Sequence, residues 1–258
     1  MIIKFIKENI RSIKYKFRLS KYQKPNYQLD SSFPLVKKIR ESGVGIIENF
    51  KGENDCALKL IDHFQKFIKS DVNEKINEAN IENKTHKSFY KFKITSLFND
   101  QDLLKLADDK FILSNITQYF GFKPYLREIN VSVDYKYKNE ANSPKFTQLF
   151  HRDPDDLKLI KVFFYLNDVN NENGPFQYVL KSHLKPWKDV EYYHNENSKR
   201  NSEKEIYTAI GKAGTMIFAD TNGLHRGLVL KEKFRVMLTL MYTSNKPITG
   251  KLEKVISD

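Results

Sequence analysis

The second half of the chain contains a series of short segments with β-strand patterns, and turns rather than regular helices separate them. In YLREINVSVDYKYK (residues 125–138) polar and apolar side chains alternate, and KLIKVFFYLNDV (158–169) is a dense run of β-branched and aromatic residues. Similar segments are PFQYVLKSH (175–183), GTMIFAD (214–220) and FRVMLTLMYTS (234–244). Strands joined by turns favour antiparallel pairing, so the sequence predicts an antiparallel sandwich or barrel over residues 124–245.

Residues 25–123 have a different pattern, in which most segments favour helices. In CALKLIDHFQKFIKSDV (56–72) apolar residues recur with a period near 3.6, and VGIIENF (44–50) is the one short strand that we expect in this part. Before them, KYQKPNYQLDSSFP (21–34) is interrupted by two prolines and is interpreted as a linker. The sequence therefore predicts a helical support region ahead of the β-rich half.

One polar, irregular stretch interrupts the β-rich half at about residues 184–212, where Asn, Glu, Lys and Tyr cluster. A long connection of this kind is predicted to be an insertion or a lid over the barrel mouth. A chain of 258 residues with 40% hydrophobic residues can bury one large core. We therefore expect residues 1–258 to form a single domain that is mainly β with α.

The first 24 residues are predicted to form a basic amphipathic helix. Ile3, Ile6, Ile10, Ile13 and Phe17 fall on one helical stripe, and lysines and arginines lie between them. Such a helix over residues 1–22 could make peripheral contact with an anionic membrane surface. The alternative, which we favour, is that the stripe packs on the protein's own core.

Composition narrows the class of protein and of partner. The formal net charge of +12 favours acidic small molecules or anionic lipid over neutral partners, but the sequence contains no nucleic-acid-binding module, so no nucleic acid is expected. The single cysteine, Cys56, excludes an internal disulfide and a cysteine-based zinc site. With no apolar run long enough to cross a bilayer, we expect a cytoplasmic protein, with membrane-peripheral attachment as the alternative.

Residues 150–156, FHRDPDD, place a histidine and a carboxylate two positions apart at the start of a strand-like region. Side chains two apart on a strand leave the same face, so His151 and Asp153 point together. With His225 they make up a 2-His-1-carboxylate set, which binds Fe(II) and leaves positions open for a 2-oxo acid and O2. Arg235, ten residues after His225, could hold the far carboxylate of that acid through a forked contact.

Each of these residues also has a plainer interpretation. His151 and Asp153 could form an exposed loop pair before Pro154, and His225 could be a core histidine bonded to backbone. Arg235 is merely solvated if its strand faces the other way. His183 is interpreted as ordering a turn, and we assign no role to the three remaining histidines, which lack partners in the sequence: His63, His86 and His194.

The region from about Gln148 to Tyr242 resembles the phytanoyl-CoA dioxygenase family of Fe(II)/2-oxoglutarate-dependent oxygenases. The similarity lies in QLFHRD (148–153), FFYLNDVNNENGPFQYVLKSH (163–183) and GTMIFADTNGLHRG (214–227), followed by Arg235, in the order that the family has. This resemblance implies a double-stranded β-helix, a cupin-like jelly roll, with the helical N-terminal region packed on it.

The resemblance implies that His151, Asp153 and His225 are the catalytic iron ligands and that Arg235 pairs with the distal carboxylate of 2-oxoglutarate. An aspartate at position 153, instead of alanine or glycine, implies hydroxylation rather than halogenation. Many family members have a serine or threonine hydroxyl where this chain has Gly227. We expect the hydroxyl of Thr239 or Tyr165 to replace it and Gln148 to line the same pocket.

The resemblance thus implies a dioxygenase that uses Fe(II), 2-oxoglutarate and O2 to hydroxylate an unactivated carbon of a small or medium metabolite, releasing succinate and CO2. The candidate substrates are an acidic sugar, an acyl derivative or a lipid-linked precursor. Residues expected to meet an acidic group are Arg152, Arg226, Lys161 and Arg127. The alternative is a non-catalytic jelly-roll protein that binds a glycan or an anionic lipid.

Overall fold

The structure is a computed structural model, and it describes the β-rich half and much of the helical region. The described residues are 32–67, 90–93, 100–135, 146–153, 155–184, 193–194, 205–231, 234–245 and 253–254. The predicted helix over residues 1–24, most of the linker and most of the predicted lid at 184–212 lie outside them. Among the described residues, no helix has both the length and the apolar character needed to span a membrane.

The larger of two β-sheets has the strand order β1-β9-β5-β11-β3-β12, and β2 also pairs with β3. Neighbouring strands are antiparallel, except that β12 runs parallel to β3. The strand bounds are β1 (Val44–Ile47), β2 (Tyr90–Lys93), β3 (Tyr125–Tyr135), β5 (Leu159–Tyr165), β9 (Met216–Asp220), β11 (Phe234–Thr243) and β12 (Glu253–Lys254).

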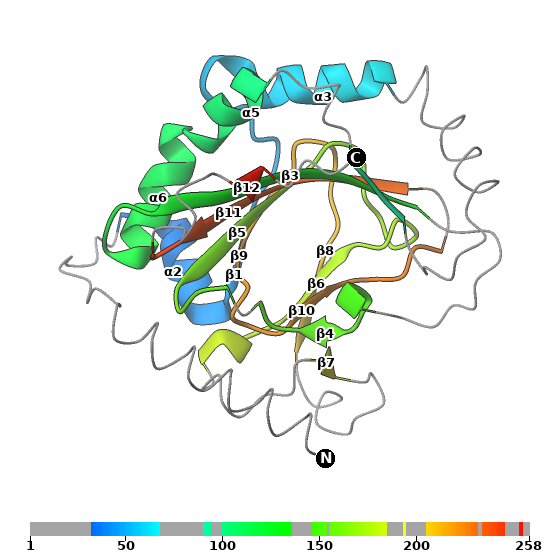
Figure 1. The fold of residues 1–258 in the computed structure, drawn as a ribbon. Helices are drawn as coiled ribbons and strands as arrows, with labels where there is room; N and C mark the ends of the chain where they lie inside the picture. Colours follow the sequence, from blue (N-terminus) through cyan, green and yellow to red (C-terminus); the bar gives the residue numbers. More distant parts are fainter. Residues whose placement is uncertain are drawn as a thin grey trace.

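The smaller sheet has the order β7-β4-β10-β6-β8 and is antiparallel throughout. Its strands are β4 (Phe150–His151), β6 (Phe176–Val179), β7 (Tyr193–His194), β8 (Ile206–Ala209) and β10 (His225–Gly227). The chain alternates between the sheets, because β4, β6, β8 and β10 belong to one and β5, β9 and β11 to the other. This arrangement is the predicted jelly roll, and Figure 1 shows the two sheets on opposite sides of a common interior.

The helices lie on the outer side of the larger sheet (Figure 1). They are α2 (Pro34–Ser42), α3 (Cys56–Phe67), α5 (Asp100–Ala107) and α6 (Lys110–Phe120), and three short 3-10 turns are η1 (Glu53–Asp55), η3 (Phe146–Gln148) and η4 (Ser182–Leu184). Pro34 was expected to belong to the linker, but it is the first residue of α2. The fixed φ of proline suits the start of a helix. The described helices of the support region therefore pack on the β core, which agrees with the prediction for this part of it.

The strand at residues 44–47 belongs to the core itself. Residues of β1 pair with β9 in the register Val44↔Ala219 to Ile47↔Met216, so the larger sheet extends beyond the predicted core of 124–245. Gly45 on this strand lies against α2, because a Cβ at this position would be 2.5 Å from Leu35 Cδ1. The sequence of residues 44–50 predicted a strand here, but it did not predict that the partner strand lies about 170 residues later in the chain.

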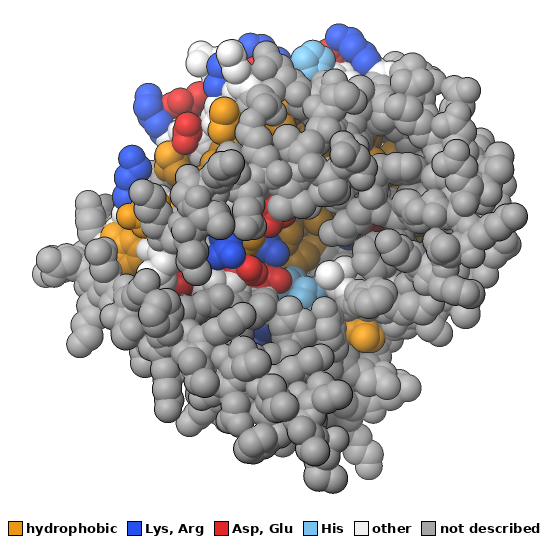
Figure 2. Space-filling view, viewed as in Figure 1, with side chains coloured by type: hydrophobic (Ala, Val, Ile, Leu, Met, Phe, Trp, Pro, Cys, Tyr) orange, Lys and Arg blue, Asp and Glu red, His pale blue; other side chains and the backbone are white. Residues whose placement is uncertain are grey.

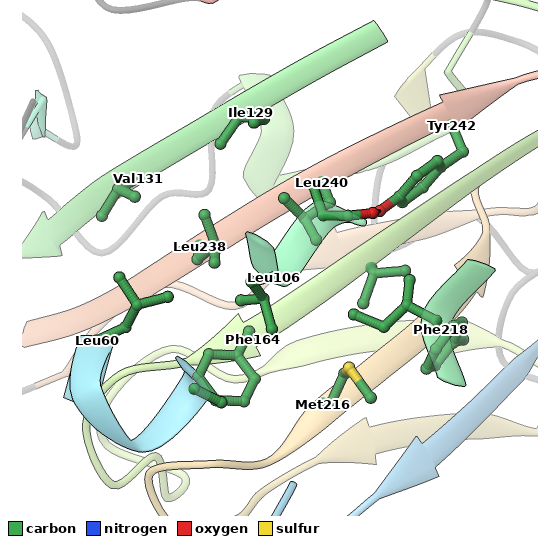
Figure 3. Close-up of a cluster of buried hydrophobic side chains, with 14 of the residues drawn as sticks. Leu60, Leu106, Ile129, Val131, Phe164, Met216, Phe218, Leu238, Leu240 and Tyr242 are labelled. Carbon is green, nitrogen blue, oxygen red and sulfur yellow. Dashed lines mark hydrogen bonds between the residues drawn. The ribbon is translucent and has the colours of Figure 1, made fainter. Parts of the chain in front are cut away.

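Alternate residues of the central strands serve two different cores. On β5, Ile160, Val162 and Phe164 join the cluster that packs against the helices, whereas Phe163 and Tyr165 join the cluster between the sheets. Figure 3 shows Phe164 among leucines of β11 and of the helices. Both faces of the strand are therefore largely buried, which explains the dense run of β-branched and aromatic residues within 158–169.

We expect Phe164→Ala to lower the free energy of unfolding by about 3–5 kcal/mol, because the ring is 1% exposed and the space it leaves cannot close fully. Chemical denaturation with two spectroscopic probes measures this change. Leu184→Ala is the matched control, since Leu184 is 64% exposed, and its unfolding free energy should change by less than about 0.5 kcal/mol.

Candidate metal centre

Two neighbouring strands of the smaller sheet bring the two predicted histidines together. His151 on β4 lies directly opposite His225 on β10 in the antiparallel register, and their ring centroids are 4.3 Å apart. Side chains of directly opposed residues in an antiparallel pair leave the same face of the sheet. Residues 74 positions apart in the chain therefore face one point in the interior.

The backbone fixes which nitrogen of each ring faces that point. His151 Nδ1 donates to the Leu149 carbonyl at 2.9 Å, and His225 Nδ1 donates to the Gly223 carbonyl at 3.0 Å. The protons are thus on Nδ1, and each Nε2 keeps its lone pair for a metal. The Nε2 atoms lie 3.9 Å and 3.4 Å from the two Asp153 carboxylate oxygens, for His151 and His225 respectively.

Asp153 is fixed in place by its backbone and by Lys161. Its N–H donates to the Thr221 carbonyl at 2.9 Å, and Lys161 Nζ on β5 lies 2.8 Å from its Oδ2. Burial acts to raise the pKa of Asp153, but Lys161 and the two histidines act more strongly, so this pKa lies well below its usual range. Asp153 is therefore a buried, ionised carboxylate.

His225 is correspondingly neutral. Burial, followed by the effect of neighbouring His151, lowers the pKa of His225 to about 3, although Asp153 acts in the opposite direction. A neutral imidazole is the form that ligates a metal. The ligand atoms of His151, Asp153 and His225 all lie within 4.8 Å of one another, and all three residues are buried.

This donor set fits a ferrous ion. Two imidazole nitrogens and one carboxylate, each oriented by a second contact, are the ligands of the facial triad in non-heme iron oxygenases. Among the described residues, no other group of three or more potential ligands of this kind is brought together. The sequence-based choice of His151, Asp153 and His225 thus agrees with the geometry.

A cavity of about 130 Å³ opens beside the triad, between the two sheets. Figure 2 shows acidic, basic and histidine side chains gathered in the hollow at the centre of the view. The polar lining residues include Glu128, Asn130, Asp134, Gln148, Lys161, Arg226, Arg235 and Thr239, and the apolar ones Phe163, Phe176, Leu228, Leu230 and Met237.

Arg235 points into this cavity but already has partners. Its Nη2 lies 2.7 Å from Asp134 Oδ2, and its Nη1 donates to the Gly174 carbonyl. The guanidinium rests on Gly227, where a Cβ would come within 3.1 Å of Nη2. Gly227 therefore provides space for the arginine, at the position where the resemblance led us to look for a hydroxyl.

Neither residue expected to replace that hydroxyl lies beside Arg235 with a free hydroxyl. The Tyr165 hydroxyl donates to the Ala209 carbonyl and accepts from the Phe176 N–H, and Tyr165 is not among the cavity-lining residues. Thr239 does line the cavity, but it follows Arg235 by four residues, which is about 13 Å along a strand. Gln148 lines the cavity as expected.

Of the basic residues expected to meet an acidic substrate, two line the cavity and two do not. Lys161 is paired with Asp153, and Arg226 donates twice to Gln177 Oε1 while stacking over the Phe150 ring. Arg152 instead donates to the Asn222 and Ser182 carbonyls, and Arg127 pairs with Asp155. The expectation of an acidic substrate therefore has little support from these side chains.

Asp134 is the site residue that the sequence interpretation missed. It lies on β3 directly opposite Arg235 and is 3% exposed. A signal was present, because Glu128, Asn130, Ser132 and Asp134 alternate with apolar residues along this strand. An alternating polar face normally points to solvent, however, and here it faces the interior.

We expect Lys161→Met to destabilise the metal-free protein, because it leaves the buried Asp153 carboxylate without its cation. Removing one partner of a buried ion pair costs about 3–5 kcal/mol. A divalent metal would restore the missing positive charge, so saturating Mn²⁺ should raise the Tm of this variant more than that of the wild type. Equal increases in Tm on addition of Mn²⁺ to the two proteins would show that Lys161 does not balance the charge of Asp153.

Comparison with known proteins agrees with this site. Residues 122–228 match the family model of phytanoyl-CoA dioxygenase (PhyH), which contains the triad and the smaller-sheet strands β4, β6 and β10. The resemblance to this family that the sequence predicted is confirmed over residues 122–228, and the iron/2-oxoglutarate prediction agrees with the grouping of His151, Asp153 and His225. A comparison with curated proteins finds no match.

Several solved structures share the fold of this chain at low sequence identity. The epimerase SnoN, in complex with Fe3+, alpha ketoglutarate and nogalamycin RO, aligns with a TM-score of 0.57 and 16% identity over 81% of this chain and 81% of that chain. HygX from Streptomyces hygroscopicus, with nickel and 2-oxoglutarate bound, aligns with a TM-score of 0.52 and 13% identity over 84% and 87%. AviO1 from Streptomyces viridochromogenes Tue57 has a TM-score of 0.51 and 12% identity over 84% and 96%.

Proposed function

We propose that this chain, whose residues 122–228 match the phytanoyl-CoA dioxygenase family model, belongs to that family and hydroxylates an unactivated carbon of a small or medium metabolite. The observation that carries the proposal is the convergence of His151 Nε2, His225 Nε2 and the Asp153 carboxylate, with both Nδ1 atoms already bonded to backbone. These three residues would hold Fe(II). The bound iron and 2-oxoglutarate would supply the oxidising chemistry, consuming O2 and releasing succinate and CO2.

The protein's own contribution is orientation and exclusion of water. Hydrogen bonds from the two histidines to backbone carbonyls keep both rings aimed at the metal position, and Lys161 keeps Asp153 in place before a metal arrives. Phe163, Phe176 and Met237 form an apolar wall beside this position. An apolar wall keeps bulk water away from a reactive centre and directs the oxidant toward substrate.

Arg235 is the residue that we assign to the distal carboxylate of 2-oxoglutarate. It is 6% exposed and lines the cavity, and its Nε has no hydrogen-bond partner among the described residues. A buried donor without a partner favours an incoming acceptor. Gln148 and Thr239 would then form the polar wall that faces the substrate or co-substrate.

A small organic molecule is the substrate class that fits a cavity between the two sheets. Proteins with this fold that were solved with ligands hold such molecules, for example nogalamycin RO in SnoN. The candidate classes are an acidic sugar, an acyl derivative or a lipid-linked precursor. SnoN is described as an epimerase and SnoK, at a TM-score of 0.50, 14% identity and 86% coverage of both chains, as a carbocyclase, so the fold alone does not select hydroxylation.

The proposal is tested with the full chain under anaerobic conditions. Addition of Fe(II) and 2-oxoglutarate should produce the visible charge-transfer absorption of an iron-bound 2-oxo acid. Admission of O2 should then release succinate, and a substrate library screened by mass spectrometry should yield a product heavier by one oxygen atom. Products of unchanged mass but altered stereochemistry would support the oxygenase site and contradict hydroxylation.

Absence of both the absorption band and any iron binding would contradict the proposed function. In that case the alternative of a non-catalytic jelly-roll protein would remain, and its ligand, a glycan or an anionic lipid, should bind equally well to wild type and to His225→Ala. Calorimetry with the two proteins separates these outcomes.

A further inference from the structure

We propose that Asp134 is a specificity-determining residue that shares Arg235 with the co-substrate and thereby weakens the preference of the site for a 2-oxo acid with a distal carboxylate. This inference rests on the proposed function, because it concerns how the same site binds its 2-oxo acid. Asp134 and Arg235 face each other across β3 and β11, at directly paired positions.

The contacts of the guanidinium limit how a further carboxylate can bind. Nη2 lies 2.7 Å from Asp134 Oδ2, Nη1 donates to the Gly174 carbonyl, and Nε has no partner among the described residues. A guanidinium has five N–H donors, so donors remain for one more acceptor. The incoming carboxylate must nevertheless bind beside an existing one, because Asp134 already holds Nη2.

Burial makes this sharing costly for an anion. The side chains of Arg235 and Asp134 are 7% and 4% exposed, so their charges largely cancel with little help from water. Two carboxylates in one buried site repel each other. A pair with almost no net charge attracts the distal carboxylate of 2-oxoglutarate less than a lone arginine would.

The other cavity-lining cations bond to groups of the protein itself. Lys161 is paired with Asp153 at 2.8 Å, and Arg226 is directed at Gln177 Oε1. Glu128 adds a further carboxylate to the lining. Asp134 also cannot move far from Arg235, because both residues are fixed in the register of paired strands.

A purely structural role for Asp134 leads to the opposite expectation. If Asp134 only orients Arg235, its neutralisation should loosen the arginine and weaken binding of 2-oxoglutarate. Asp134→Asn distinguishes the two roles, since the amide oxygen can still accept from Nη2 while the negative charge is lost.

The experiment measures binding of two acids to Mn²⁺-loaded protein by calorimetry. One acid is 2-oxoglutarate, and the other is 2-oxopentanoate, which has the same chain length without the distal carboxylate. We expect wild type to prefer 2-oxoglutarate by less than roughly tenfold. Asp134→Asn should bind 2-oxoglutarate roughly tenfold to a hundredfold more tightly, as expected for removal of a nearby like charge, and 2-oxopentanoate with unchanged affinity.

Asp62→Asn is the matched control, because it removes the same charge from the exposed surface of α3, where Asp62 pairs with Lys66. Its affinities for both acids should equal those of wild type. Unchanged or weaker binding of 2-oxoglutarate to Asp134→Asn, or a wild-type preference above roughly tenfold, would overturn this inference alone. The wild-type preference decides the matter even if Asp134→Asn does not fold. Failure of every metal-loaded variant to bind either acid would overturn the proposed function as well.

Discussion

His225→Ala is expected to lose iron binding and, with it, all coupled release of succinate. The ring provides one of the two Nε2 atoms that face Asp153, and among the described residues His151 is the only other histidine in this group of possible ligands. Loss of an outer contact to a metal ligand already costs 10- to 100-fold in affinity, so we expect loss of a ligand itself to cost more than roughly a hundredfold. Anaerobic Fe(II) titration and succinate assays measure the two effects.

His151→Ala should behave in the same way, because the two histidines are equivalent across the β4–β10 pair. His63→Ala is the matched control, since His63 lies on the exposed face of α3. If either His151→Ala or His225→Ala bound iron with the affinity of the wild type, the proposed metal centre would be contradicted. Circular dichroism of the metal-free proteins would verify that the variants keep the fold.

The fold was predictable where local pattern and burial agree. The strands β3, β5, β9 and β11 each lie within a segment whose composition favours strands, and the resemblance supplied the jelly-roll connectivity. The partner of β1 could not be predicted, because a four-residue apolar strand can pair with any exposed sheet edge. In the structure β1 also packs against α2, a tertiary contact that the sequence of the strand does not specify.

The metal ligands were predictable because their chemistry restricts the residue types. Two histidines, a carboxylate and a later arginine, in the order that the family has, match few other kinds of site. The choice of His151 and His225 did not require knowledge of the strand register that brings them together. The partners of Lys161 and Arg235 were not predictable in this way. Both were expected to meet a bound acid, but each pairs with an aspartate of this chain. Such pairs depend on which residues the folded strands place side by side, and this cannot be read from the sequence alone.

Arg235→Met is expected to lower the free energy of unfolding by about 3–5 kcal/mol, because it leaves Asp134 buried without a cation. The same variant should bind 2-oxoglutarate more weakly than wild type, since Asp134 then repels the distal carboxylate, while its iron affinity stays unchanged. Denaturant titration measures the stability, and calorimetry with Mn²⁺-loaded protein measures the co-substrate affinity.

The double variant Asp134→Asn with Arg235→Met separates the two consequences. Removal of both charges leaves no unpaired ion in the interior, so the double variant should recover most of the stability that Arg235→Met loses. It should not regain 2-oxoglutarate binding, because no cation remains opposite the distal carboxylate. Full recovery of co-substrate binding would mean that Arg235 only offsets Asp134, and that some other cavity residue holds the acid. Equal stabilities of Arg235→Met and the double variant would mean that the buried pair contributes nothing to the fold.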